Sequence, residues 1–377
     1  LYFILNIIPL YWQKSFQLSA YYFPTVRSAA IASIIFTLKS HLYSLIIDLP
    51  TSIFKTFYIE QKHGFNKQTV KFYAIDQIKQ NLVGMLFSSM FISTIVKSIE
   101  VTGDYFVPIT SAVTIVLSGL VIWLVPNFIL PLFDRYEALD QEIPLYGKIV
   151  QICSKFKFPM SKVEVQCSGN VRSAHSNAFF VGICSKKIVF FDTLLKKQHK
   201  ALENDSDLKK ESKSQVEFED EELLAILCHE LGHWYYNHMP RTYFLLIIML
   251  FLNLSCAKYL VANDAIFKEA NLPENFAVKV LFSTSEILGP IMSICMILIT
   301  FHQRKLETEA DNFAVKNNYK DLLISALKKI STQNKCYPYY DHLFSQFNHS
   351  HPPLSMRIAA ILGFENDLNL TDLMNSK

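Results

Sequence analysis

The chain has 377 residues, of which 51% are apolar and only 18% are charged. This composition excludes a typical soluble enzyme and indicates a membrane protein, because a soluble chain carries a larger share of charged residues on its surface. The formal net charge of +3 is spread without a basic block, so the sequence does not favour a nucleic-acid partner.

Apolar segments of membrane-spanning length recur through the chain. Residues 1–10 are apolar but too short to cross a bilayer, and they look like the end of a truncated helix. Polar connections are predicted at residues 11–27 and in a lysine-bearing loop at residues 50–80. Complete spans are predicted at residues 28–49, 81–97, 105–126, 242–261 and 276–301.

Two ionisable side chains, Lys39 and His41, lie within the first complete span. Charged groups are costly in lipid, so both side chains are expected to face the interior of the helix bundle or a wet cavity. The alternative for Lys39 is that its long side chain reaches back to the membrane surface.

Residues 127–241 are predicted as a soluble segment. An amphipathic helix at residues 141–158 ends before Pro159. Three strand-length apolar stretches follow, at residues 162–167, 178–181 and 187–191, and we expect them to form a small antiparallel sheet. Residues 196–222 are rich in lysine and acidic side chains and predict a solvated loop.

The number of spans gives an orientation. Residues 50–80, 127–241 and 302–377 fall on one face of the membrane, and that face carries most of the lysine and arginine. The positive-inside rule therefore assigns it to the cytosol. Glycosylation requires a lumenal acceptor in an accessible loop, so we expect none at the four Asn-x-Ser/Thr sequons. These begin at Asn204, Asn253, Asn348 and Asn369.

The stretch His229-Glu230-Leu231-Gly232-His233 carries the clearest chemical signal in the chain. On a helix its two histidines share one face, where both imidazoles can bind a single zinc ion. Glu230 lies beside the first histidine, where its carboxylate can take a proton from the water that such an ion activates. This is the metallopeptidase signature His-Glu-x-x-His. The alternative is a chance match on an ordinary amphipathic helix.

A zinc hydrolase needs a third protein ligand and an open coordination position. Glu307 is the predicted third ligand, in an acidic stretch after the last span. Asp311 lies one turn further along the same helix face, where it can accept the free N–H of a ligand histidine. Glu309 is expected to point elsewhere. The alternative is that these carboxylates form only a charged helix surface.

With several further segments, these residues resemble the type I CAAX prenyl proteases, a Ste24-like family of membrane zinc metalloproteases. Many peptidases share the zinc motif, whereas the combination of segments is highly specific, and it covers nearly the whole chain in family order. The matching segments are residues 59–69, 130–133, 172–180, 190–195, 229–234, 307–314 and 351–354 with Arg357.

The resemblance implies a mainly α fold, a multi-pass transmembrane helical barrel that encloses a water-filled chamber. A zincin-like cytosolic catalytic part and a small β-sheet complete it. Of the seven family helices, the first is absent here and the second is truncated. The implied domains are membrane helices in 1–126 with a cytosolic loop at 50–80, a catalytic segment in 127–241, two membrane helices in 242–301, and C-terminal catalytic helices in 302–377.

The resemblance also assigns roles that the residues alone do not. Asn177 and Ala178 would lie on an exposed strand edge that pairs with an extended peptide substrate, with His175 and Arg357 as further substrate-binding residues. His351 would stabilise the oxyanion near the scissile carbonyl. Without the family, a strand-flanking asparagine is ordinary turn chemistry, and a histidine before two prolines is a loop residue.

The implied function is a zinc endopeptidase, with one Zn²⁺ per chain, that removes the last three residues of prenylated CAAX proteins and makes a second, upstream cut in certain precursors. Its partners would be prenylated substrates and the lipid bilayer, not nucleic acid. The implied location is the endoplasmic reticulum and inner nuclear membrane, with the catalytic face cytosolic.

Two other functions remain open from the residues. One is a membrane quality-control zinc protease without any prenyl requirement. The other is a non-enzymatic membrane scaffold that retains a structural zinc. A structural site would need four protein ligands, and the sequence offers three at good spacing.

Overall fold

The computed structural model describes residues 7–25, 28–167, 172–195 and 217–363, and these residues are mainly helical. The chain divides into two compact units. The first comprises Leu1–His63, Gln68–Val121 and Phe244–Cys295, and the second Gly64–Lys67, Ile122–Tyr243 and Met296–Lys377. The first unit contains most of the apolar helices, and the second contains the sheet and the histidine motif.

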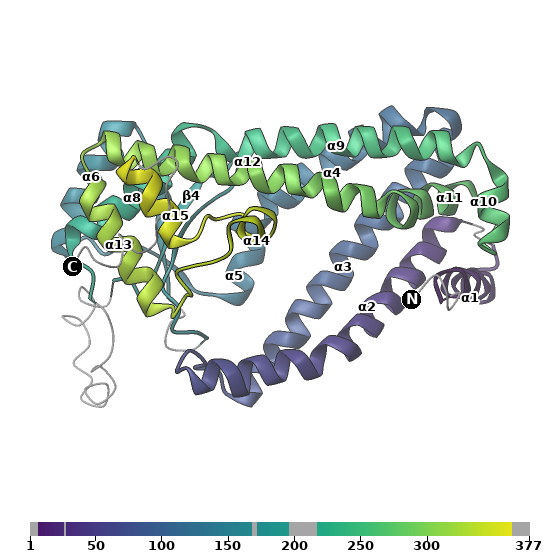
Figure 1. The fold of residues 1–377 in the computed structure, drawn as a ribbon. Helices are drawn as coiled ribbons and strands as arrows, with labels where there is room; N and C mark the ends of the chain where they lie inside the picture. Colours follow the sequence, from purple (N-terminus) through teal and green to yellow (C-terminus); the bar gives the residue numbers. More distant parts are fainter. Residues whose placement is uncertain (1–6, 26–27, 168–171, 196–216, 364–377) are drawn as a thin grey trace. The chain divides into compact units, whose positions relative to one another are not determined.

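Helices build the first unit. Figure 1 shows α2 and α3 running side by side, and α1 also packs on α2. The elements are α1 (Ile7–Tyr22), α2 (Ala29–Phe54), α3 (Val70–Thr102), α4 (Phe106–Leu124), α10 (Asp264–Glu269), α11 (Phe276–Phe282), most of α9 (His238–Val261) and the beginning of α12 (Gly289–Lys316).

The connection expected at residues 11–27 is wrong, because α1 occupies most of it. The polar residues of this segment are typical of a connection. Trp12, however, is buried and stacks on Phe36 of α2, with 4.2 Å between the ring centroids. Packing of an aromatic face on a neighbouring helix, rather than intrinsic propensity, stabilises such a segment.

The loop expected at residues 50–80 is also wrong over most of its length. The helical run of α2 continues as a π-helical turn at Lys55–Glu60, and α3 begins at Val70 behind a Thr69 cap whose hydroxyl accepts the Phe72 N–H at 3.2 Å. Polar side chains at the start of α3 find partners on the helix itself, since Gln80 Nε2 donates to Asp76 Oδ2 at 2.7 Å. The sequence therefore looked polar where the backbone is helical.

Lys39 of α2 contacts the neighbouring helix α1. Its Nζ is 3.3 Å from the Tyr11 carbonyl oxygen, 3.5 Å from Ser15 Oγ and 4.6 Å from the centre of the Tyr11 ring, all on α1. His41 Nε2 similarly lies 3.1 Å from Asn81 Oδ1 of α3. Both ionisable side chains thus face neighbouring helices, as expected for groups kept out of lipid.

Among the described residues, three helical runs are long and apolar enough to cross a membrane: Ala29–Glu60, Val70–Phe133 and His238–Val261. The second is interrupted by a 3-10 turn at Gly103–Tyr105, across which Ser98 Oγ and Thr110 Oγ1 are 3.0 Å apart. On a straight helix twelve residues span about 18 Å. The chain therefore folds back at Gly103, and this run holds two of the five predicted spans.

The last predicted span, at residues 276–301, is wrong as a single straight helix. Helices α11 and α12 meet at 58° around a π-helical turn at Ser283–Ile287. Pro290 lies at the start of α12 and has no N–H to donate to the preceding turn, which accounts for a break there. Helix α12 then continues to Lys316, so that part of a span and Glu307 share one helix.

A four-stranded sheet forms part of the second unit, in the order β1-β2-β4-β3. The strands are β1 (Tyr136–Ala138), β2 (Val163–Gln166), β3 (Ala178–Val181) and β4 (Lys187–Phe191). The antiparallel expectation holds for β3 with β4 but is wrong for β2 with β4, which pair in parallel. Strand β3 lies at one edge of the sheet.

Helix α8 (Asp220–Tyr235), labelled in Figure 1, contributes to the core of this unit and carries the histidine motif. It contacts α6 (Pro144–Phe156), α13 (Lys320–Gln333) and strand β3. Leu223, Leu227 and Leu231 of α8 are fully buried in the core. A capping box of Glu219 and Glu222 begins the helix, and Lys329 Nζ of α13 donates to Glu222 Oε2 at 2.6 Å. These contacts hold the motif on a rigid element.

Two sequence predictions concern segments outside the described residues. The solvated loop predicted at residues 196–222 falls there as far as residue 216, and α8 begins at Asp220. The predicted C-terminal helical region is described as far as Gly363, with α14 (His342–Asn348) and α15 (Leu354–Leu362) as its last helices.

Candidate active site

A glycine brings together the two helices that carry the predicted metal-binding residues. A Cβ added to Gly232 of α8 would lie 3.0 Å from the Ala310 Cα and 3.1 Å from the Phe313 Cβ of α12. Contacts this short leave no room for a side chain, so the α8 and α12 backbones approach closely at this point. The approach places the histidines of α8 opposite the carboxylates of α12.

Gly232→Ala is expected to push these helices apart and to weaken both metal retention and activity. Overpacking of this kind typically costs about 1–3 kcal/mol. Thermal unfolding of the purified protein, together with its metal content, measures the effect. Gly147→Ala on α6 is the matched control, since a Cβ there meets no atom within 4 Å. Equal stability and metal content in the two variants would contradict the close approach.

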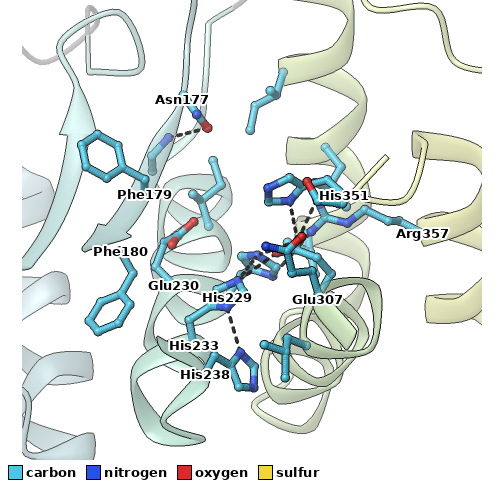
Figure 2. Close-up of a pocket in the computed structure, with 18 of the residues that line it drawn as sticks. Asn177, Phe179, Phe180, His229, Glu230, His233, His238, Glu307, His351 and Arg357 are labelled. Atoms are coloured by element: carbon cyan, nitrogen blue, oxygen red, sulfur yellow. Dashed lines mark hydrogen bonds and ion pairs between the residues drawn. The ribbon is translucent and has the colours of Figure 1, made fainter. Parts of the chain in front are cut away.

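His229, His233 and Glu307 converge, as Figure 2 shows. One ligand atom from each lies within 4.8 Å of the others. The two histidine Nε2 atoms are 3.2 Å apart, and Glu307 Oε1 is 3.4 Å from His233 Nε2. Two imidazole nitrogens and a carboxylate oxygen suit a tetrahedral metal ion and leave one coordination position open. Among the described residues, this is the one cluster of three such groups that could hold a metal ion.

Asp311 orients the first histidine. Its Oδ1 lies 2.9 Å from His229 Nδ1, whereas the other ring nitrogen, Nε2, faces Glu307 Oε2 at 3.7 Å. Arg357 of α15 holds the same carboxylate, with Nε 2.9 Å from Oδ2 and Nη2 2.6 Å from Oδ1. The sequence predicts this contact between Asp311 and a ligand histidine. The family resemblance implies a substrate-binding role for Arg357, and in the structure its guanidinium is engaged by Asp311 at the wall of the same cavity.

The second histidine has a partner that sequence reasoning missed. His238 Nδ1 lies 2.8 Å from His233 Nδ1, and His238 Nε2 lies 3.2 Å from Glu309 Oε2. Arg241 Nη1 is 2.5 Å from the same oxygen of Glu309. Glu309 points away from the predicted ligands, as expected. Its carboxylate contacts His238 and Arg241, which both lie at the beginning of α9.

Glu230 and His351 lie on either side of the cluster (Figure 2). Glu230 is 8% exposed, and burial raises the pKa of its carboxyl. A raised pKa suits a group that must take up a proton and release it again near neutral pH. His351 Nδ1 lies 3.1 Å from Glu307 Oε2, and the rest of its ring is exposed. One ring nitrogen is thus engaged, while the other remains available to a ligand.

A cavity of about 410 Å³ opens onto these residues. One wall is the edge strand β3 with Asn177, and another is apolar, from Leu323, Leu327 and Ile330. The Asn177 carbonyl accepts the Phe191 N–H, so the backbone groups of Phe180 face the free edge of β3. An extended chain in this cavity could therefore pair with backbone groups.

The predicted substrate residues lie in different places. Asn177 and Ala178 line the cavity, and Asn177 Oδ1 accepts the Ala178 N–H at 2.9 Å. His175 is not among the lining residues. Its ring stacks on Phe65 with 4.0 Å between centroids, and its Nδ1 is 3.4 Å from Asn334 Oδ1. The structure thus brings Asn177 and Ala178 to the cavity, whereas the His175 ring packs on Phe65.

Comparisons with known proteins agree along most of the chain. The family model "CAAX prenyl protease N-terminal, five membrane helices" matches residues 1–135, and the model of peptidase family M48 matches residues 145–365. The chain is similar to CAAX prenyl protease 1 homologues of Taenia solium, at 36% identity over 89% of this chain and 73% of the relative, and of Homo sapiens, at 32% identity over 94% and 78%.

A solved structure also resembles the chain. The crystal structure of S. mikatae Ste24p matches with a TM-score of 0.81 and 26% sequence identity, covering 96% of this chain and 82% of that one. With the helical content and the small sheet, this match confirms the predicted fold class.

Proposed function

The chain belongs to peptidase family M48 and is an integral membrane metalloprotease, and from that premise we propose that it removes the last three residues of prenylated CAAX proteins. The observation that carries the proposal is the convergence of His229, His233 and Glu307 beside the buried Glu230, at a cavity walled by a strand edge. The names of the similar proteins support the substrate class. A second, upstream cut in certain precursors follows the same chemistry.

The donor set fits zinc, and His229, His233 and Glu307 would hold it. Zinc bound there would supply Lewis acidity to a water molecule and to the scissile carbonyl. Glu230 accepts the proton as the water attacks, and it donates that proton to the leaving amine nitrogen. Asp311 keeps the free N–H of His229 engaged, which fixes the orientation of that ring.

Substrate binding uses the cavity wall. The free edge of β3, at the Ala178 carbonyl and the backbone groups of Phe180, pairs with the backbone of an extended peptide, and Asn177 lies where that edge begins. The apolar residues of α13 offer a surface for the hydrophobic end of the substrate. His351 donates to the developing oxyanion through the nitrogen that does not face Glu307.

His351→Ala is expected to lower turnover by roughly 10²–10³-fold, the usual effect of losing one oxyanion donor, with little change in zinc content. Single-turnover kinetics with a farnesylated peptide measure this effect, and His342→Ala, at an exposed position of α14, is the control. An unchanged rate would make His351 an ordinary loop residue.

The location proposed for this chain is the endoplasmic reticulum and inner nuclear membrane, with the active site on the cytosolic side. We expect no glycosylation at any of the four sequons in a eukaryotic cell. Asn253 lies within the span candidate His238–Val261, and Asn348 is the last residue of α14. A glycosidase-sensitive mass shift mapped to Asn348 would contradict the proposed orientation. An engineered sequon in the 262–275 segment is the positive control.

The experiment that tests the proposal compares a farnesylated CAAX peptide with its unprenylated twin. Cleavage of the farnesylated peptide alone, after the modified cysteine, is the expected result. Equal cleavage of both would favour a membrane quality-control protease without a prenyl requirement. A protein that holds one zinc ion but cleaves neither peptide would favour the scaffold with a structural metal.

A further inference from the structure

His238 is buried, touches a proposed metal ligand, and has no role in the mechanism above. Its side chain is 3% exposed, and it contacts His233 through Nδ1 and Glu309 through Nε2. We propose that His238 is a positioning residue, which links the metal ligand His233 to the carboxylate of Glu309. This inference rests on the proposed zinc centre and concerns how that centre is held.

The backbone between α8 and α9 makes the contact possible. On an uninterrupted helix, a residue five positions after His233 would lie about 140° around the axis from it and could not face it. Asn237 has φ +53°, in the left-handed region, and it separates α8 from α9. Asparagine tolerates this conformation better than most residues. The chain therefore turns at Asn237, and His238 lies next to His233 (Figure 2).

The direction of the hydrogen bonds is fixed from both ends. At one end, His233 must offer the lone pair of Nε2 to the metal, so its proton is on Nδ1 and it donates to His238 Nδ1. At the other end, the carboxylate of Glu309 can only accept, so His238 Nε2 carries the proton and donates to it. A neutral imidazole has one donor and one acceptor nitrogen, and His238 satisfies both requirements with a single tautomer.

Arg241 holds the carboxylate of Glu309 in place. Its Nη1 and Nη2 atoms lie 2.5 Å and 3.3 Å from the two oxygens of Glu309. The carboxylate is thus held by an arginine, as Asp311 is held by Arg357 on the other side of the metal cluster. Each proposed ligand histidine is therefore connected to a carboxylate–arginine pair. His229 reaches its carboxylate directly, and His233 reaches its carboxylate through His238.

The link has a chemical consequence for the metal. A hydrogen bond from Nδ1 fixes the orientation of the His233 ring and increases the basicity of Nε2. Removing such a partner typically lowers metal affinity by 10–100-fold, an effect that we estimate at roughly the same size here. If His238 acted through packing alone, an apolar ring of similar size would fill the space and preserve zinc affinity. Such a ring cannot accept the proton of His233, so a hydrogen-bonding role predicts weaker zinc binding.

The test compares His238→Phe with His238→Gln in the purified protein. The phenylalanine fills the site and can still stack on Tyr236, whose ring is stacked on His238. The glutamine amide retains an acceptor for His233 and a donor for Glu309. Zinc affinity is measured by competition with a chromophoric chelator, and thermal unfolding verifies that each variant is folded. We expect about 10–100-fold weaker zinc binding for the phenylalanine variant and substantial recovery for the glutamine variant.

Glu309→Gln is a second variant that leaves the histidine in place. Its side chain is 27% exposed, so the substitution is well tolerated, and we expect zinc binding to weaken in the same direction. Wild-type affinity in His238→Phe, or equal loss in the phenylalanine and glutamine variants, would overturn the proposed link. A wild-type protein that binds no zinc would overturn the metal centre as well. Failure of the wild-type protein to cleave a farnesylated peptide, with zinc binding intact and sensitive to His238, would overturn the proposed function alone.

Discussion

Glu230→Gln is expected to abolish peptide cleavage while leaving the zinc content unchanged. The substitution keeps the shape of the side chain but removes the only described carboxylate in the cavity that is not a proposed metal ligand. A general base of this kind contributes typically about 10²–10⁴-fold to the rate. In the proposed mechanism the same group also returns the proton to the leaving amine, so we expect the loss to lie at the upper end of that range.

The measurement pairs cleavage kinetics with metal analysis of the same preparation. Glu221→Gln is the matched control, because Glu221 lies on the same helix but does not line the cavity. Its side chain is half-exposed, and its Oε1 forms an ion pair with Lys148 Nζ at 2.6 Å. An active Glu230→Gln variant would show that another group takes the proton. Loss of zinc in this variant would show that Glu230 supports the metal rather than the chemistry.

Glu307→Ala is expected to lose both zinc and activity. Glu307 is 4% exposed and is the proposed ligand contributed by α12, so its removal leaves two histidines on one helix to hold the ion. Glu309→Ala should retain zinc at saturating concentration, since that residue acts only through His238. Inductively coupled plasma mass spectrometry of the two purified variants distinguishes these results. Full zinc and activity in Glu307→Ala, with loss of both in Glu309→Ala, would mean that the wrong glutamate was chosen.

Helical spacing predicts which residues of each helix lie on the same face. His229 and His233 are four residues apart, and so are Glu307 and Asp311, and each pair shares one face of a single helix in the structure. Spacing does not predict that these two helix faces lie opposite each other. This arrangement depends on the close approach at Gly232, which is a property of tertiary packing.

The contact of His238 with His233 could not be predicted by the same spacing rule. It depends on the left-handed conformation of Asn237 and on the position of Glu309, which lies on a different face of α12 from Glu307. A signal did exist, since asparagine is common at breaks between helices. Only the structure shows which residues such a break brings together.

The fold predictions failed where packing outweighs local composition. Residues 11–27 and 50–80 look polar, yet most of them are helical, since Trp12 stacks on α2 and the polar side chains at the start of α3 have partners on the helix itself. The parallel pairing of β2 with β4 could not be read from strand composition, because it depends on the order of the strands in the sheet. The family resemblance, by contrast, rested on segments along the whole chain, and the comparisons confirm it.

We propose that zinc held by His229, His233 and Glu307 serves a protease of prenylated CAAX substrates. The most direct measurement is incubation of the purified protein with a farnesylated CAAX peptide, before and after zinc is removed by a chelator and then restored. Mass spectrometry should show a product that lacks the last three residues, disappears on chelation and returns with zinc. Cleavage that persists in the zinc-free protein, or no cleavage by the zinc-loaded protein, would contradict the claim.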